Sequence, residues 1–240
     1  MLFRRANPMV PVASFALLVS ASAAQAGLLT NGSLDGPTNT FSLVPEGWAN
    51  LVQGTTDTVS VAGHPFAGFG NIAAQPYPAS PNGGTFCWSA DFFESNAALP
   101  EGLRQTVSGF TIGATYEIAF EYTNLGLYSA QGNILTDAFN AQNYASSGRW
   151  LVGVDDTQVG ATDAVNFAPR TGAQVWTTYA VSFVASATSH ELRFTADWVS
   201  GGTHVGMGID GITLTLVPAP TAAGVLALGG ALGLRRRRGA

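Results

Sequence analysis

The stretch Tyr116-Glu117-Ile118-Ala119-Phe120-Glu121-Tyr122 decides the fold class. Large apolar side chains occupy every second position of it: Tyr116, Ile118, Phe120 and Tyr122. The acidic residues Glu117 and Glu121 stand between them. This period of two predicts a β-strand with one buried and one polar face.

The same alternation recurs on both sides of this stretch. Residues 191–199 place Leu192, Phe194, Ala196 and Trp198 opposite polar neighbours, and 150–154 is another apolar run. Residues 175–184 bring together Val175, Tyr179, Val181 and Phe183, and the last run aligns Ile212, Leu214 and Leu216. Two long interruptions, 73–82 and 123–148, separate the runs, and loops of such length are often functional. No helix is predicted between them, so the fold class is all-β, a single β-sandwich.

Both ends of the chain differ in composition from the middle. Two arginines, an apolar run at 9–18 and an A-x-A site, Ala24 to Ala26, predict a signal peptide cut before Gly27. Four further arginines close an apolar run at 221–234: Arg235, Arg236, Arg237 and Arg238. We therefore expect a signal peptide at 1–26, an ectodomain at 27–216 and a targeting tail at 217–240.

The tail resembles the PEP-CTERM sorting signal of exported bacterial proteins. The residues that carry the likeness are a proline box of Val217, Pro218, Ala219 and Pro220, the apolar run, and the arginines. Ala219 departs from the glutamate usual in that family. The resemblance implies a short transmembrane sorting helix, transient anchoring in the inner membrane and cutting by an exosortase-type protease. It also implies release to the outer surface or exopolysaccharide matrix of a Gram-negative bacterium.

Charge excludes one class of partner. The sequence has no lysine, and only four arginines of the ectodomain face its fifteen acidic residues, which gives a net charge near −11. Nucleic acid is therefore not expected as a partner, because phosphate binding needs a basic surface. The single cysteine, Cys87, allows no disulfide within the chain, and either a buried thiol or pairing between chains is open.

The order of short motifs resembles the galactose-binding-like jelly roll of many carbohydrate-binding modules and DUF642-type wall proteins. These motifs are an N-G-S-L-D opening at 31–35, a G-W at 47–48, L-R-Q-T-V-S-G-F at 103–110 and a closing I-D-G-I at 209–212. In that family the opening carboxylate and the closing aspartate hold a structural calcium ion. The matching residues here are Asp35 and Asp210, with Asn31 and Ser33 as further oxygen donors. Alternation places Asp210 on the apolar face with Ile212, where a hydrogen-bonded structural role is the alternative to calcium.

Aromatic residues supply the candidates for glycan contact. Trp88 with Phe92, and Trp198 with Tyr128 and Tyr144, are the two predicted platforms, with burial in the core as the alternative. No catalytic motif is recognisable, although Asp91 with Glu94, or Asp155 with Asp156, would be the carboxylate pairs of a hydrolase. We predict a non-catalytic glycan-binding or structural protein of the cell surface, with extracellular polysaccharide as partner. The alternatives are a polysaccharide-active hydrolase and a matrix protein that has no defined ligand.

Overall fold

A computed structural model describes residues 27–38, 42–51, 56–62, 77–92, 100–127, 144–167 and 175–219, with the backbone alone for Phe92. Its elements are all strands: β1 (Ala49–Asn50), β2 (Asp57–Val59), β3 (Phe86–Phe92), β4 (Gly102–Ser108), β5 (Thr115–Asn124), β6 (Ser146–Val154), β7 (Thr157–Ala161), β8 (Val165–Asn166), β9 (Thr177–Val184), β10 (Ser189–Gly201) and β11 (His204–Leu216). Within these ranges there is no helix that could cross a membrane. The signal peptide, most of the tail and Tyr128 lie outside the described residues.

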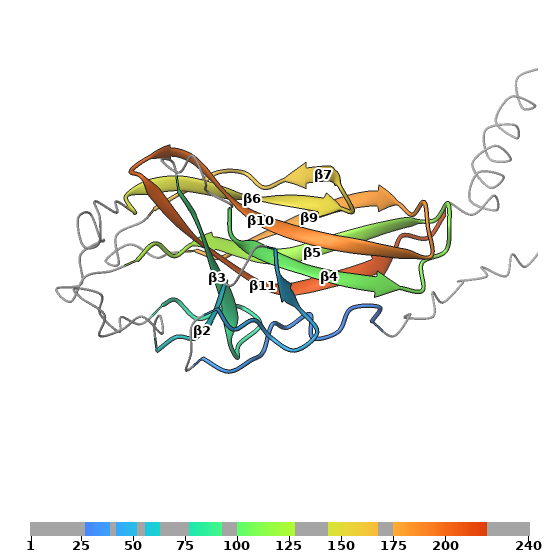
Figure 1. The fold of residues 1–240 in the computed structure, drawn as a ribbon, viewed down its shortest axis with the longest axis horizontal. Helices are drawn as coiled ribbons and strands as arrows, with labels where there is room; N and C mark the ends of the chain where they lie inside the picture. Colours follow the sequence, from blue (N-terminus) through green and yellow to red (C-terminus); the bar gives the residue numbers. More distant parts are fainter. Residues whose placement is uncertain are drawn as a thin grey trace, which may run out of the picture.

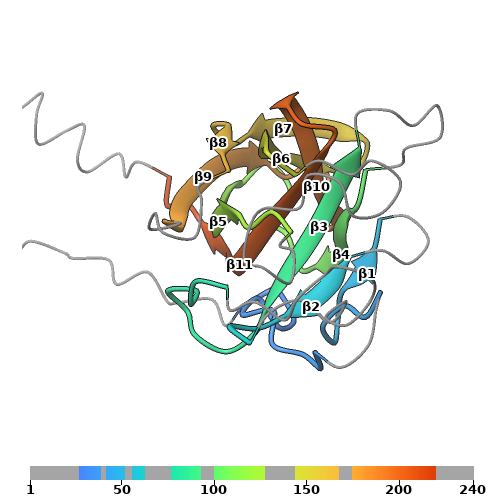
Figure 2. The ribbon, with the colours of Figure 1, turned by 90° about the vertical axis from the view of Figure 1, so that its left-hand side faces the viewer.

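The strands form two sheets that pack face to face (Figure 1). One sheet has six strands in the order β1-β4-β10-β6-β7, with β8 beside β6. The other has five strands in the order β2-β3-β11-β5-β9. Figure 2 shows β1 and β2 on one flank, each at the edge of a different sheet. All pairings between the strands are antiparallel, and the predicted all-β jelly-roll sandwich is confirmed.

The main core lies between the sheets and follows the predicted alternation. In β5 the four predicted side chains Tyr116, Ile118, Phe120 and Tyr122 are all buried. In β10, Leu192, Phe194 and Ala196 are buried from the opposite sheet. The rings of Phe120 and Phe194 meet edge to face with centroids 5.4 Å apart, a favourable aromatic arrangement that joins the two sheets.

Several predicted positions are corrected at the edges of this core. Val175 precedes β9 and is 65% exposed, because the strand begins only at Thr177. Leu216 is 43% exposed, because it ends β11 beyond the cover of the facing sheet. The predicted interruption 123–148 is shorter than expected, since β5 continues to Asn124 and β6 begins at Ser146.

A second, smaller apolar cluster covers part of the outer face of the five-stranded sheet. Its buried members are Val59, Tyr77, Phe86, Trp88, Ala90, Leu125, Leu127 and Tyr144. Alternation in β3 explains the division, since Cys87 points into the main core while Phe86 and Trp88 point to the other side. This sheet is therefore covered on both faces in that region.

A β-bulge in β11 changes which face Asp210 occupies. Asp210 pairs with Glu121 but Thr213 pairs with Ala119, so β11 contains one extra residue there. Gly211 sits in this bulge with φ +60°, a backbone conformation that strains other residues, and an added Cβ would lie 2.1 Å from Asn82 Nδ2. Asp210 therefore shares the outer face with Glu121, and the predicted shared face with Ile212 and Leu214 is wrong.

Candidate functional site

The outer face of the six-stranded sheet is the candidate functional surface. It carries the side chains of β4, β6 and β10 that point away from the core. Every arginine in the described residues lies on it: Arg104, Arg149 and Arg193. Two hollows open on this face along β6 and β10, separated by the pair Arg149 and Asp197.

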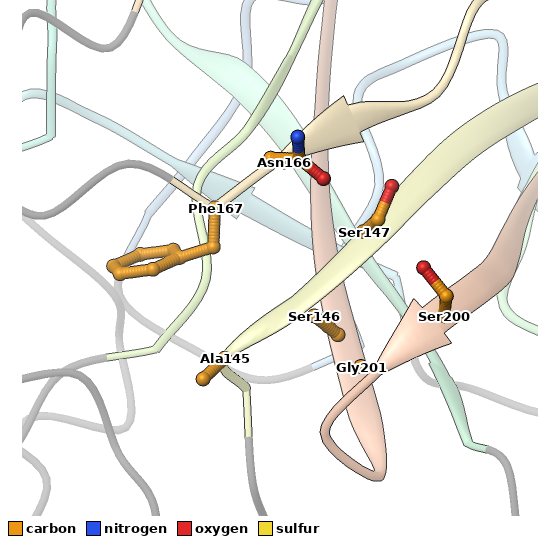
Figure 3. Close-up of a pocket in the computed structure, with 7 residues that line it drawn as sticks. All are labelled: Ala145, Ser146, Ser147, Asn166, Phe167, Ser200 and Gly201. Atoms are coloured by element: carbon orange, nitrogen blue, oxygen red, sulfur yellow. The ribbon is translucent and has the colours of Figure 1, made fainter.

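The first hollow lies where β8 joins β6 and has a volume of about 180 Å³ (Figure 3). The lining residues are Ala145, Ser146, Ser147, Asn166, Phe167, Ser200 and Gly201. Strand register aligns three of them in a row, because Ser200 is opposite Ser147 on one side and Asn166 is opposite Ser147 on the other. Ser147 forms the buried floor, while Asn166 and Ser200 are exposed at the sides.

These three side chains retain free hydrogen-bonding capacity. Within the described part of the chain, the side-chain hydroxyls of Ser147 and Ser200 and the side-chain amide of Asn166 form no hydrogen bond. A hydroxyl and an amide can each both donate and accept. Figure 3 shows their polar atoms around one shared space. The hollow therefore offers an uncharged set of donors and acceptors to a hydroxyl-rich ligand.

Side-chain hydrogen bonds to backbone carbonyl oxygens hold the frame of this hollow in place. Asn124 Nδ2 donates to the carbonyl oxygens of Ser146 and Val165, at 2.9 and 3.0 Å, which ties β6 to β8. Ser146 Oγ donates to the His204 carbonyl oxygen. Gly201 has φ +79°, and a Cβ there would lie 2.9 Å from the Ala145 carbonyl oxygen, so glycine permits the close approach. The site is built on strands that are fixed before a ligand binds.

The second hollow has a volume of about 150 Å³ and lies further along the same two strands. Gly153 leaves space at its floor, and Leu151, Gln158, Arg193 and Thr195 line it. The seven residues from Ser147 to Gly153 span about 20 Å from the first Cα to the last in an extended strand. The two hollows thus define a surface long enough for an extended oligosaccharide.

Ion pairs surround the second hollow. Arg193 donates to Glu191 Oε1 at 2.5 Å and to Asp156 Oδ1 at 2.9 Å, and Arg149 Nε donates to Asp197 Oδ2 at 2.5 Å. Exposed pairs of this kind add little to folding stability. They do hold donors and acceptors at fixed positions. With Arg104, which also contacts Glu191, three arginines balance the three carboxylates. The face is therefore rich in polar groups without a strong charge of either sign.

The predicted carboxylate pair of a hydrolase is a turn in the structure. Asp155, with φ +54°, accepts from the Glu191 backbone N–H at 2.9 Å, and its Oδ2 lies 2.7 Å from His190 Nδ1. The Glu191 N–H and the His190 ring hold the pKa of Asp155 below its ordinary value. His190 Nε2 accepts from the Ser186 and Ala187 amides, so the ring is occupied in joining two turns. Glu94 lies outside the described residues.

Most predicted aromatic contacts are corrected. Trp88 and Tyr144 are both 3% exposed and belong to the smaller apolar cluster, with ring centroids 6.2 Å apart. Trp88 Nε1 donates to the Gly126 carbonyl oxygen at 3.0 Å. Trp198 is half-buried and packs against the main core. None of the three forms an exposed platform, and the side chains of Phe92 and Tyr128 lie outside the described residues.

The four predicted calcium ligands divide into two groups. Asn31, Ser33 and Asp35 close on one another, since Ser33 Oγ contacts Asn31 Oδ1 at 3.2 Å and Asp35 Oδ2 at 3.0 Å. Asp35 Oδ1 also accepts from the Thr85 amide at 3.1 Å. In the described ranges, no three His, Cys, Asp or Glu side chains are arranged to hold a metal. Calcium therefore stays a prediction.

Asp210 is the member of that set whose surroundings best suit a cation. It is fully buried, and burial raises its pKa to about 6. Ser80 Oγ donates to Asp210 Oδ2, whereas Asp210 Oδ1 is buried with no hydrogen-bond partner among the described residues. A buried carboxylate oxygen in this state would be satisfied by a proton, a bound water or a cation. The Asp210 carboxylate would supply oxygen ligands to calcium here. The Asp35 carboxylate is close enough to raise the pKa of Asp210 by charge repulsion.

Cys87 is fully buried in the main core, and burial raises the pKa of its thiol. Its surroundings fit the predicted inert thiol rather than a disulfide between chains. Sequence reasoning missed Ser147, Asn166 and Ser200, because isolated polar residues carry no pattern. Only strand register brings them together.

Comparison with known proteins gives the fold. No protein-family model matches the sequence, and no curated protein matches it. A cyclase from Fischerella sp. TAU in complex with 4-(1H-indol-3-yl)butan-2-one is similar at a TM-score of 0.50 and 16% identity, over 80% of this chain and 98% of the cyclase.

Two carbohydrate-binding modules have lower scores. TmCBM61, in complex with beta-1,4-galactotriose, has a TM-score of 0.43 and 12% identity over 80% of this chain and 100% of the module. The CBM22-1 xylan-binding domain from Paenibacillus barcinonensis Xyn10C has a TM-score of 0.43 and 16% identity over 83% and 100%. These likenesses are of fold alone, and one fold serves many functions. Neither the cyclase's reaction nor the modules' ligands pass to this chain.

Proposed function

We propose that this chain is an exported, non-catalytic glycan-binding protein that holds a neutral polysaccharide on the outer face of its six-stranded sheet. The observation that carries the proposal is the row Ser200, Ser147 and Asn166, whose free polar groups face one hollow. Uncharged hydroxyl and amide groups match the donors and acceptors of sugar hydroxyls. Strands preorganise them, so little order is lost on binding.

The ion pairs beside the hollows favour a neutral ligand over an acidic one. Each described arginine of this face already contacts a carboxylate: Arg104 and Arg193 contact Glu191, and Arg149 contacts Asp197. An acidic glycan would have to displace these partners within a strongly acidic ectodomain. A neutral sugar can share the donors and acceptors without breaking a pair.

Export and sorting form the second part of the proposal. The last strand ends at Leu216, directly before the proline box that begins at Val217. This position supports a tail separate from the sandwich, available to a membrane and to an exosortase-type protease. We further propose that signal peptidase cuts before Gly27 and that the processed protein resides at the cell surface or in the exopolysaccharide matrix.

The test is affinity electrophoresis or a glycan array with the secreted protein. Asn166→Leu with Ser200→Leu should weaken binding by roughly ten- to a hundredfold, since several ligand hydrogen bonds worth about 1 kcal/mol each are lost. Both side chains are exposed, so folding is retained. The control is Thr106→Leu, an exposed position on β4 of the same face.

Three outcomes discriminate the alternatives. Neutral glycan binding that the double variant loses and the control keeps supports the proposal. Absence of binding to any glycan would favour a structural matrix protein. Release of reducing ends from a bound polysaccharide would indicate a hydrolase.

A further inference from the structure

One end of the sandwich is formed by the turns at 109–114 and 185–188. The Gly109 amide donates to the Thr188 carbonyl oxygen at 2.9 Å, and the Ala185 amide donates to the Ala114 carbonyl oxygen at 2.9 Å. The chain leaves the last strand at this same end, where the Val217 amide donates to the Thr115 carbonyl oxygen at 2.9 Å. We call residues 109–114, 185–188 and 216–219, with the adjoining Val184, the exit end. It lies to the right in Figure 1.

The exit end contains no charged residue and exposes several apolar side chains. Residues 108–116, 178–189 and 211–219 contain no Asp, Glu, Lys or Arg. Of six large hydrophobic side chains exposed in the described residues, four belong to it: Ile112 at 62%, Val184 at 61%, Leu216 at 43% and Val217 at 36%. Backbone pairing keeps them close, since Val184 is the partner of Thr115 and Leu216 the partner of Tyr116. Clustered exposed apolar residues mark contact surfaces, whereas scattered ones do not.

The tail limits how far this surface can be from a membrane. Only the four residues 217–220 separate β11 from the apolar run at 221–234. Four residues span at most about 14 Å when fully extended. If the apolar run lies in the bilayer, the exit end must lie at the level of the headgroups. Leu28 also lies at this end, since its Cδ2 would be 3.0 Å from a Cβ added at Gly109. The segment that follows Gly27 therefore starts beside the exit end.

We propose that the exit end docks on the lipid surface while the tail is inserted, with Ile112 and Val184 entering the headgroup region. This rests on the membrane anchoring proposed for the tail. Apolar side chains gain free energy when they leave water for the interface. No residue of the exit end itself is charged, and the neighbouring Asp155 carboxylate is joined to the 185–188 turn through His190.

Docking at this end would orient the glycan site. Strand β10 begins at Ser189, beside the exit end, and reaches Gly201 in the first hollow. Its thirteen residues cover about 40 Å. The exit end would thus hold the first hollow about 40 Å from the bilayer, facing the extracytoplasmic space.

The test uses the full chain from residue 27 to residue 240 in vesicles of phosphatidylcholine and phosphatidylglycerol. Ile112→Cys is labelled with an environment-sensitive fluorophore, and Ser200→Cys, at the far end of β10, is the matched control. Cys87 is fully buried, so the unaltered chain provides the labelling blank. Flotation reports insertion of the tail, and quenching by lipids spin-labelled near the headgroup reports contact of the labelled site.

We expect a blue shift and quenching at position 112, and neither at position 200. Flotation without quenching at 112 would overturn the docking and leave the anchor intact. Equal quenching at both positions would overturn it too, since the domain would then lie flat. A blue shift without lipid quenching, joined with cross-linking between copies, would assign the surface to a second copy instead. Absence of flotation would refute the anchor and the docking with it.

Discussion

Replacing Phe120 by alanine tests the inward face on which the fold depends. Phe120 is 1% exposed, in the middle of β5. Its ring lies 5.4 Å from that of Phe194 across the sandwich and 5.6 Å from that of Tyr179 on β9. Alanine removes these contacts and leaves a cavity between two sheets that cannot collapse freely. We expect a loss of about 3–5 kcal/mol in the free energy of unfolding.

Urea unfolding followed by tryptophan fluorescence measures this loss. With a slope of about 2–3 kcal/mol per molar urea for a domain of this size, the midpoint should fall by roughly 1–2 M. The slope itself should not change, since the surface exposed on unfolding is almost the same. A changed slope would indicate that the variant no longer unfolds in one step.

The matched control is Glu117→Ala on the same strand. Glu117 is half-buried on the outer face and lies opposite Thr215 and Ser182. Its loss should cost less than about 0.5 kcal/mol, as for most surface substitutions. Equal costs for the two variants would refute the strand register, because a slip of one residue exchanges the faces.

The remaining predictions concern the tail, calcium and the Asp155 turn. Intact-mass spectrometry of protein recovered outside the cell should show a chain without residues 235–238, and an uncut C-terminus as the sole form would contradict sorting. Calcium should raise the melting temperature, because a free calcium concentration of a hundred times its dissociation constant stabilises the folded state by about 2.7 kcal/mol. Asp210→Ala should abolish this response, and Asp156→Ala should keep it. Equal melting temperatures of the unaltered protein in calcium and in chelator would refute the predicted calcium site. Because the pKa of Asp155 is lowered in the folded protein, its carboxylate stabilises the fold fully above the ordinary aspartate pKa. This stabilisation is lost as the pH falls through the folded-state pKa. Asp155→Ala should therefore weaken the decrease in the free energy of unfolding below about pH 4. An unchanged pH dependence in that range would show that the Asp155 carboxylate does not stabilise the fold.

The sequence by itself determined the fold class and most of the inward faces. Alternation at 116–122 and 191–199 predicted the buried side chains of β5 and β10, and both predictions are confirmed. This was possible because the period of two is a local property of a strand. The ends of the runs were less well predicted, as Val175 and Leu216 show, since cover depends on the facing sheet.

Tertiary structure alone decided the positions of Asp210 and Trp88. One extra residue at Gly211 places Asp210 on the face opposite to that of Ile212. This bulge is defined by the pairing of β11 with β5, so alternation along β11 alone could not predict it. Trp88 is buried by Tyr144 and its neighbours, which come from elsewhere in the chain. The signal available in the sequence was the glycine in I-D-G-I, which permits a bulge without requiring one.

The candidate glycan site shows the same limit. Ser147, Asn166 and Ser200 are common residues at unremarked places in the sequence, and they form a row only through the pairing of three strands. Side-chain alternation is set by neighbouring peptide units, whereas register and bulges are set by the packing of strands distant in the chain. The sequence could therefore state which residues are buried in a strand, but only the assembled sheets could state which side chains meet.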